Sequence, residues 1–104
     1  MSGANPARGE AMLRVGDRLM TVRPSFAALV AAESETGPLL ALVDRAAEGR
    51  LTLAEMEALL WHCLVDRPKT MARATLGEAL LAKGLGAAMP AIRAILRQAL
   101  AGGQ

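Results

Sequence analysis

Apolar residues after Pro24 recur every three or four positions, which is the spacing that buries one face of a helix. Glycine or proline interrupts this pattern at short intervals, so the helices must be short. The chain has 104 residues, of which 53% are hydrophobic, so one core can form without a metal ion or a disulfide. Because only 2% of the residues are aromatic, this core must be aliphatic. These features predict a single, mainly helical domain.

The segment that precedes the helices has a different pattern. Two short apolar-leaning runs, residues 12–15 and 19–22, flank Gly16-Asp17, a pair that is typical of a tight turn. The pattern predicts a β-hairpin over residues 10–23. Because two strands alone are barely stable in water, the hairpin must pack on helices or pair with a strand of another chain.

Helices are predicted over residues 25–101. The first has a good N-cap in Ser25 and ends at Gly37, and the second begins at Pro38 and ends at Gly49. The expected fold class is therefore α+β, mainly α, with an N-terminal β-hairpin followed by about five short helices.

The third helix has the clearest start. Thr52 and Glu55 match a capping box, in which the threonine side chain accepts from the Glu55 amide and the glutamate reaches back. The apolar residues that follow, up to Leu64, form a stripe along one face, and Pro68 is expected to end the helix.

The last third of the chain predicts two more helices, over residues 70–83 and 88–101. A second capping box, Thr75 to Glu78, lies inside the fourth helix and suggests that its ordered part begins later than residue 70. No linker in the sequence is long enough to separate two domains, so residues 10–104 are expected to form one domain.

The N-terminus and the apolar runs predict where the protein is found. Residues 1–9 lack periodicity and are expected to be a flexible arm. They contain no apolar segment of the kind that directs secretion. The longest uninterrupted apolar run, residues 26–32, has seven residues, whereas a membrane-spanning helix needs about 20. These observations predict a cytoplasmic protein without a membrane segment.

Charge is segregated along the chain. The formal net charge of +2 is the sum of +2 over residues 1–23, −5 over residues 24–66 and +5 over residues 67–104. In one interpretation, the acidic and basic faces neutralise each other within one fold. In the other, a basic C-terminal face binds an acidic partner or the acidic middle of a neighbouring copy.

No arrangement of titratable residues predicts catalysis. His62 and Cys63 are adjacent on a helix and point about 100° apart, so they cannot share a ligand position. His62 and Asp66 are close enough to pair, but two ligands do not make a zinc site. Glu33 and Glu35 have no basic cluster beside them in the sequence. We therefore expect Cys63 in the core, a partly exposed His62, no metal or other cofactor, no small-molecule substrate and no enzymatic activity.

The third and fourth predicted helices have the outline of a helix-turn-helix, with Arg67, Lys69 and Arg73 nearby. A recognition helix normally presents several Arg, Lys, Asn or Gln side chains to base edges. Residues 70–83 offer only Arg73 and Lys83. A small nucleic-acid-binding regulator is therefore the least favoured of the functions considered.

Short motifs spread over most of the chain match a known family in their order and spacing. They are Asn5 to Glu10, Arg23-Pro24, Ala28-Leu29 with Glu33 and Gly37, Leu39 to Arg45, Gly49-Arg50-Leu51 before Leu59-Leu60-Trp61-His62, and Gly77-Glu78 with Leu80 and Gly84. Through these motifs the chain resembles the small tail proteins of gene transfer agents and siphophage-like tails. The resemblance implies either a tail assembly chaperone, encoded beside the tape-measure protein, or a tail tube protein, and it implies no catalytic residues.

The chaperone is the first of these expectations. A tape-measure protein is a long amphipathic helix that aggregates unless its apolar stripe is covered, and a small helical domain with an aliphatic groove can cover it. The alternative is a structural tail tube or tail-tip subunit whose hairpin pairs across subunits. A tube protein normally needs more strands than one hairpin, which favours the chaperone.

The expected binding groove lies on the third predicted helix and the C-terminal helix, where two arginines can hold acidic flanks of a bound helix. The contact residues expected there are Met56, Leu60, Leu64, Ile92, Leu96, Leu100, Arg93 and Arg97. The expected partner is the tape-measure protein or another tail protein, and a homo-oligomer is left open. The expected location is the cytoplasm of a bacterial host cell, with association with the virion as the alternative.

Overall fold

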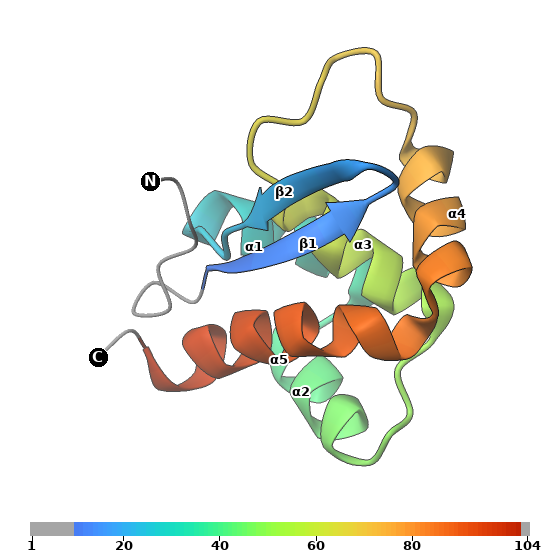
Figure 1. Cartoon of the computed structure of the whole chain (residues 1–104). Coiled ribbons are helices and arrows are strands. Elements are labelled where there is room, and N and C mark those ends of the chain that lie inside the picture. Colours follow the sequence, from blue (N-terminus) through green and yellow to red (C-terminus); the bar gives the residue numbers. More distant parts are fainter. Residues whose placement is uncertain (1–9, 103–104) are drawn as a thin grey trace.

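The computed structural model describes residues 10–102, and the predicted arm over residues 1–9 lies outside this range (Figure 1). In the described range a two-stranded sheet precedes the helices, which confirms the predicted α+β, mainly α class. The elements are β1 (Ala11–Val15), β2 (Arg18–Val22), α1 (Phe26–Thr36), α2 (Leu39–Ala47), α3 (Leu53–Cys63), α4 (Arg73–Lys83) and α5 (Leu85–Ala101).

The predicted hairpin is confirmed. Strands β1 and β2 pair in antiparallel fashion, with Leu13 opposite Met20, and a two-residue turn joins them. Its first residue, Gly16, has a φ of +65°, which glycine adopts without strain and which matches the first position of a type II′ turn. One face of the hairpin is buried against the helices, and α4 and α5 both contact β1. The hairpin therefore packs on its own helices.

The two edges of the hairpin differ. The chain that leaves α3 runs beside β2, where the Arg23 amide donates to the Cys63 carbonyl at 2.7 Å and the Val65 amide donates to the Thr21 carbonyl at 2.9 Å. Among residues 10–102, β1 makes no backbone hydrogen bond to any element other than β2. The chain after α3 therefore covers the β2 edge, whereas the outer edge of β1, called its open edge below, has no further strand among residues 10–102.

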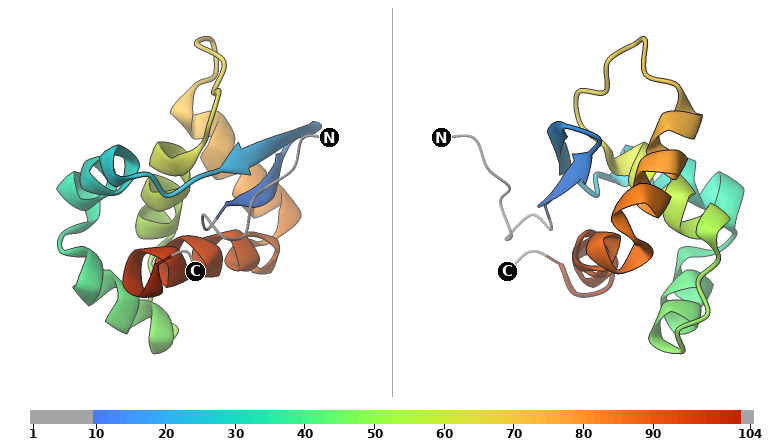
Figure 2. Two further views of the ribbon diagram at one scale, coloured as in Figure 1. Left: turned by 90° about the vertical axis from the view of Figure 1, so that its left-hand side faces the viewer. Right: turned by 45° about the vertical axis from the view of Figure 1, so that its right-hand side comes forward.

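The core is aliphatic, as expected, and centres on α3 and α5. Leu59, Leu60, Ile92 and Ile95 are each 0% exposed. In both views of Figure 2, α3 lies between the hairpin and the α1–α2 pair, and α5 runs beneath the hairpin. The helices thus enclose the buried face of the hairpin, and α1 and α2 form the far side of the molecule.

The capping box at the start of α3 is confirmed. The Thr52 hydroxyl accepts from the Glu55 amide at 3.1 Å, and the Glu55 carboxylate accepts from the Thr52 amide at 3.0 Å. The predicted end of this helix was too late, because α3 ends at Cys63 rather than near Pro68. The chain becomes extended at Leu64 and pairs with β2 instead.

The starts of the last two helices also differ from the prediction. Helix α4 begins at Arg73, which confirms that its ordered part starts later than residue 70, but its N-cap is Ala72, so the predicted capping box at Thr75 is wrong. Helix α5 begins at Leu85, three residues before the predicted start, because the chain turns at Gly84 with a φ of +93°. Pro90 consequently lies inside α5, which continues past a residue without an N–H group.

No single helix in the described range is both long enough and apolar enough to cross a membrane. The pairs α1–α2 and α4–α5 reach the required length and composition only together, and they bend by 75° and 117°.

Candidate protein-interaction surface

Five of the eight predicted contact residues belong to the core. They are between 0% and 7% exposed and pack against the hairpin and the neighbouring helices: Met56, Leu60, Leu64, Ile92 and Leu96. Leu96 also lines a groove between α2 and α5, whereas Leu64 lines a separate open pocket with Trp61 and Arg67. The predicted residues of α3 and α5 therefore do not share one surface. Apolar spacing identifies the face that a helix buries, but it does not reveal whether the same chain or a partner covers that face.

The other three predicted residues, together with Leu96, meet between two helices. They form one side of an open groove of about 350 Å³, in which α5 faces α2. Its surface is mainly apolar, and Leu100 is 62% exposed. We name it the α2/α5 groove, and it is lined by Val43, Ala46, Ala47, Arg93, Leu96, Arg97 and Leu100.

The groove stays open because its two helices pack mainly on other elements. Helix α2 packs on α1, whereas α5 packs on β1, α3 and α4. Arg93 and Arg97 are exposed, lie one turn apart on α5 and make no ion pair with any residue in the range 10–102. An apolar floor with a positive edge can bind an apolar segment that carries a carboxylate.

A second exposed apolar surface lies on α1 and was missed by the sequence analysis. Phe26 is 84% exposed and Val30 is 49% exposed. Helix α1 turns Leu29 and Ala32 toward the core. Residues 26–32 are all apolar, so spacing alone cannot select the buried face.

Charged side chains from three helices form a cluster around Arg73. The guanidinium bonds to Glu35 on α1 and to Glu57 on α3, and the His62 ring bonds to Glu35. No basic residue stands beside Glu35 in the sequence, but the fold brings Arg73 to it from 38 residues away. It also replaces the suggested pair of His62 with Asp66, because Asp66 lies beyond the end of α3 with a φ of 59°.

The cluster shifts the titration of its members. Hydrogen bonds from Arg73, and then from His62, lower the pKa of Glu35 from 4.5 to about 2. Hydrogen bonds to Glu35 and Glu57 raise the pKa of Arg73 above its ordinary value. The ion pairs hold the three helices together. Because the pKa of Glu35 is low, its carboxylate is a poor proton acceptor near neutral pH.

Cys63 lies in the core, as predicted. It is 1% exposed, and burial raises the pKa of its thiol from 9.0 to about 12, so the reactive thiolate is scarce. Within residues 10–102, no group of three or more His, Cys, Asp or Glu side chains is placed to hold a metal ion.

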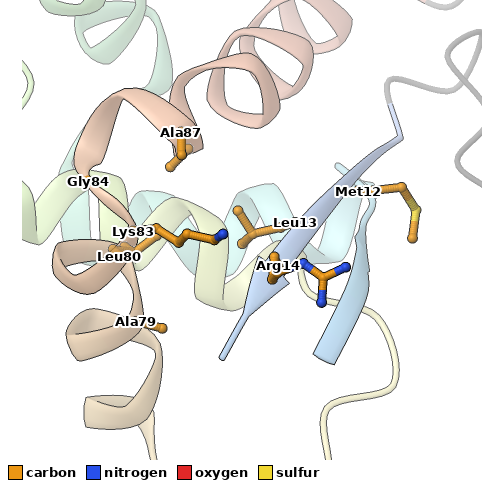
Figure 3. Close-up of a pocket in the computed structure, with 9 residues that line it drawn as sticks. Met12, Leu13, Arg14, Ala79, Leu80, Lys83, Gly84 and Ala87 are labelled. Carbon is orange, nitrogen blue, oxygen red and sulfur yellow. The ribbon is translucent and has the colours of Figure 1, made fainter. Parts of the chain in front are cut away.

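A small pocket lies beside the open edge of β1. Figure 3 shows Leu13 and the Lys83 side chain approaching each other between β1 and the α4–α5 turn. The pocket measures about 70 Å³, well below the roughly 300 Å³ at which small-molecule sites begin. It can accept a single side chain of an added strand, but not a typical metabolite.

Two of the basic residues considered for DNA binding, Arg67 and Arg73, are engaged within the fold. Two glutamates neutralise Arg73, and the Arg67 guanidinium lies 4.1 Å from the centre of the Trp61 ring. A cation held over an aromatic ring is already partly satisfied. The α4 helix therefore presents few free cations to a phosphate backbone.

A known protein family matches nearly the whole chain. A family model described as "phage tail tube protein, GTA-gp10" matches residues 8–102, which include the hairpin and the helices that pack on it. No curated protein and no solved structure matches the chain. The match confirms the resemblance to gene transfer agent and phage tail proteins. The chain therefore belongs to this phage tail protein family.

Proposed function

We propose that this chain is a structural subunit of a phage-like tail, in the tail tube or at its tip. The family match over residues 8–102 is the observation that carries the proposal. In this role the chain acts by binding other tail proteins and copies of itself, and it catalyses no reaction. It is made in the cytoplasm of a bacterial host and ends in the finished particle.

The open edge of β1 supports this proposal. A neighbouring subunit can add a strand there, because the outer backbone groups of β1 are not used by another element in the range 10–102. The small pocket between β1 and the α4–α5 turn can take one side chain of that strand. Met12, on the outer face of β1, is 36% exposed and adds apolar surface beside this edge.

Quantitative mass spectrometry of purified particles tests the proposal. A tube subunit should be present in many copies per particle, and a tip subunit in a few. Disruption of the gene should give tailless or short-tailed particles. Particles that lack the protein while their tails are normal would overturn the structural role.

A tail assembly chaperone is the second candidate, favoured by the α2/α5 groove. The groove is apolar, with Arg93 and Arg97 at its edge, and so suits an amphipathic helix with acidic flanks, such as a tape-measure protein. The sequence favoured this role because a tail tube protein normally needs more β-strands than the two of a single hairpin. The family description reverses that order.

Co-expression with the tape-measure protein tests the chaperone role. The tape-measure protein should stay soluble with the wild-type chain and precipitate with Leu100→Glu, which puts a carboxylate into the groove. Leu81→Glu is the matched control, because Leu81 is 61% exposed on α4, outside the groove. Equal solubility with and without the wild-type chain would remove this candidate.

A further inference from the structure

We propose that α1 of one copy docks in the α2/α5 groove of a second copy, so that the chain self-associates. The docking segment is the α1 stripe, defined as Phe26, Val30 and Glu33. Both halves of this contact belong to the chain itself. The inference therefore goes beyond the tail role, and it competes with the chaperone candidate, which places a tape-measure helix in the same groove.

The α1 stripe has the composition of a docking segment. Phe26, Val30 and Glu33 stand at positions i, i+4 and i+7, which lie on one side of a helix. Phe26 is the only phenylalanine in the chain and is 84% exposed. A large aromatic side chain gains more from burial at an interface than most side chains, and it fits an apolar pocket.

The α2/α5 groove offers a matching apolar surface. Leu96 and Leu100 stand one turn apart on α5, and Val43 lines the opposite side on α2. Its volume of about 350 Å³ is large enough to take the Phe26 ring together with the Val30 side chain. The stripe and the groove are on different helices, so each copy carries one of each.

Charge complementarity selects a second copy as the occupant. Arg45 and Arg73 are neutralised within the fold by Glu55, Glu35 and Glu57, whereas Arg93 and Arg97 have no such partner among residues 10–102. The stripe ends in the exposed Glu33. Its Oε2 atom accepts from the Leu39 amide at 2.7 Å, and a carboxylate retains capacity for a further donor.

This contact explains the segregated charge of the sequence. The acidic segment, residues 24–66, contains the stripe, and the basic segment, residues 67–104, contains the two arginines of the groove. Part of that charge is neutralised inside one copy, and the proposed contact pairs Glu33 of one copy with Arg93 and Arg97 of the next. Contacts between unlike surfaces close into rings or continue as filaments, depending on the angle between neighbouring copies.

Sedimentation velocity over a concentration series tests the proposal. The mean mass of the wild-type chain should rise with concentration. Phe26→Ala and Leu100→Glu should each weaken self-association by about tenfold or more. Both positions are well exposed, so the fold should persist, which far-UV circular dichroism checks. Arg97→Glu is a second groove variant, and Leu81→Ala is the control on α4.

Mixing the two variants identifies the contact itself. Phe26→Ala keeps an intact groove, and Leu100→Glu keeps an intact stripe, so an equal mixture can form one stripe-to-groove contact per pair. At a concentration where each variant alone associates at least about tenfold more weakly than the wild type, the mixture should recover association as a dimer through the one intact contact. A wild-type chain that is monomeric at every concentration would overturn the proposal. Association that is as strong in both variants as in the wild type would overturn it as well.

Discussion

The guanidinium of Arg73, the first residue of α4, donates two parallel hydrogen bonds to the carboxylate of Glu35 near the end of α1, at 2.8 and 2.6 Å. Its Nε atom donates to both carboxylate oxygens of Glu57 on α3, at 2.9 and 2.8 Å. One side chain thus joins three helices. Because the contact spans 38 residues, it fixes where α4 starts relative to the N-terminal half of the molecule.

Arg73→Gln should lower the free energy of unfolding by about 1–2 kcal/mol. Exposed ion pairs contribute about 0–1 kcal/mol each, but here one guanidinium serves two carboxylates through paired hydrogen bonds. Urea denaturation measures the change. Arg50→Gln is the control, because the Arg50 side chain is 70% exposed and its one ion pair within residues 10–102 is with the exposed Glu48, so we expect no measurable loss. Equal losses in the two variants would contradict the clamping role.

The Arg73 cluster should make the stability of the fold decrease at acidic pH. The pKa of Glu35 is about 2 in the folded chain and 4.5 ordinarily, so its contribution is complete above pH 4.5 and disappears as the pH falls toward 2. Thermal unfolding of the wild type and of Glu35→Gln should be compared across this range. The gap between their Tm values should narrow on acidification. A gap that stays constant from pH 6 to pH 2 would contradict the assignment to Glu35.

The two predicted capping boxes should respond differently to alanine. Thr52→Ala removes a hydrogen bond to the Glu55 amide and should cost about 1 kcal/mol of unfolding free energy. Thr75→Ala should cost nothing measurable, or stabilise slightly, because Thr75 lies inside α4 and alanine is the better helix former. Chemical denaturation of both variants checks this. A loss of similar size at both positions would contradict the helix starts described here.

The capping boxes also show what local sequence can and cannot predict. The hairpin, the helices and the Thr52 cap follow from spacing and from residues next to one another in the chain. The motif at Thr75 is equally good, yet it is not used, because Arg73 is engaged with α1 and α3 and α4 begins two residues earlier. A local capping motif is overridden when tertiary contacts stabilise a helix start at another residue.

The candidate site was harder to predict than the fold, for a related reason. Spacing marked Leu60 and Ile92 as apolar-face residues, and both are core. Residues 26–32 of α1 are all apolar, and the fold turns Leu29 inward while Phe26 stays exposed. A sequence pattern shows that a surface is apolar. Only the assembled fold shows which apolar surfaces remain uncovered.

Alanine substitutions along α5 separate its core face from its groove face. Ile92 is 0% exposed, so Ile92→Ala should cost about 2–5 kcal/mol of unfolding free energy. Leu100, eight residues further along, is 62% exposed, and Leu100→Ala should stay within about 0.5 kcal/mol of the wild type. Urea denaturation of the two variants measures both values. Similar losses would mean that Leu100 is packed in the folded chain, and substitutions at this position would then report on folding rather than on binding at the α2/α5 groove.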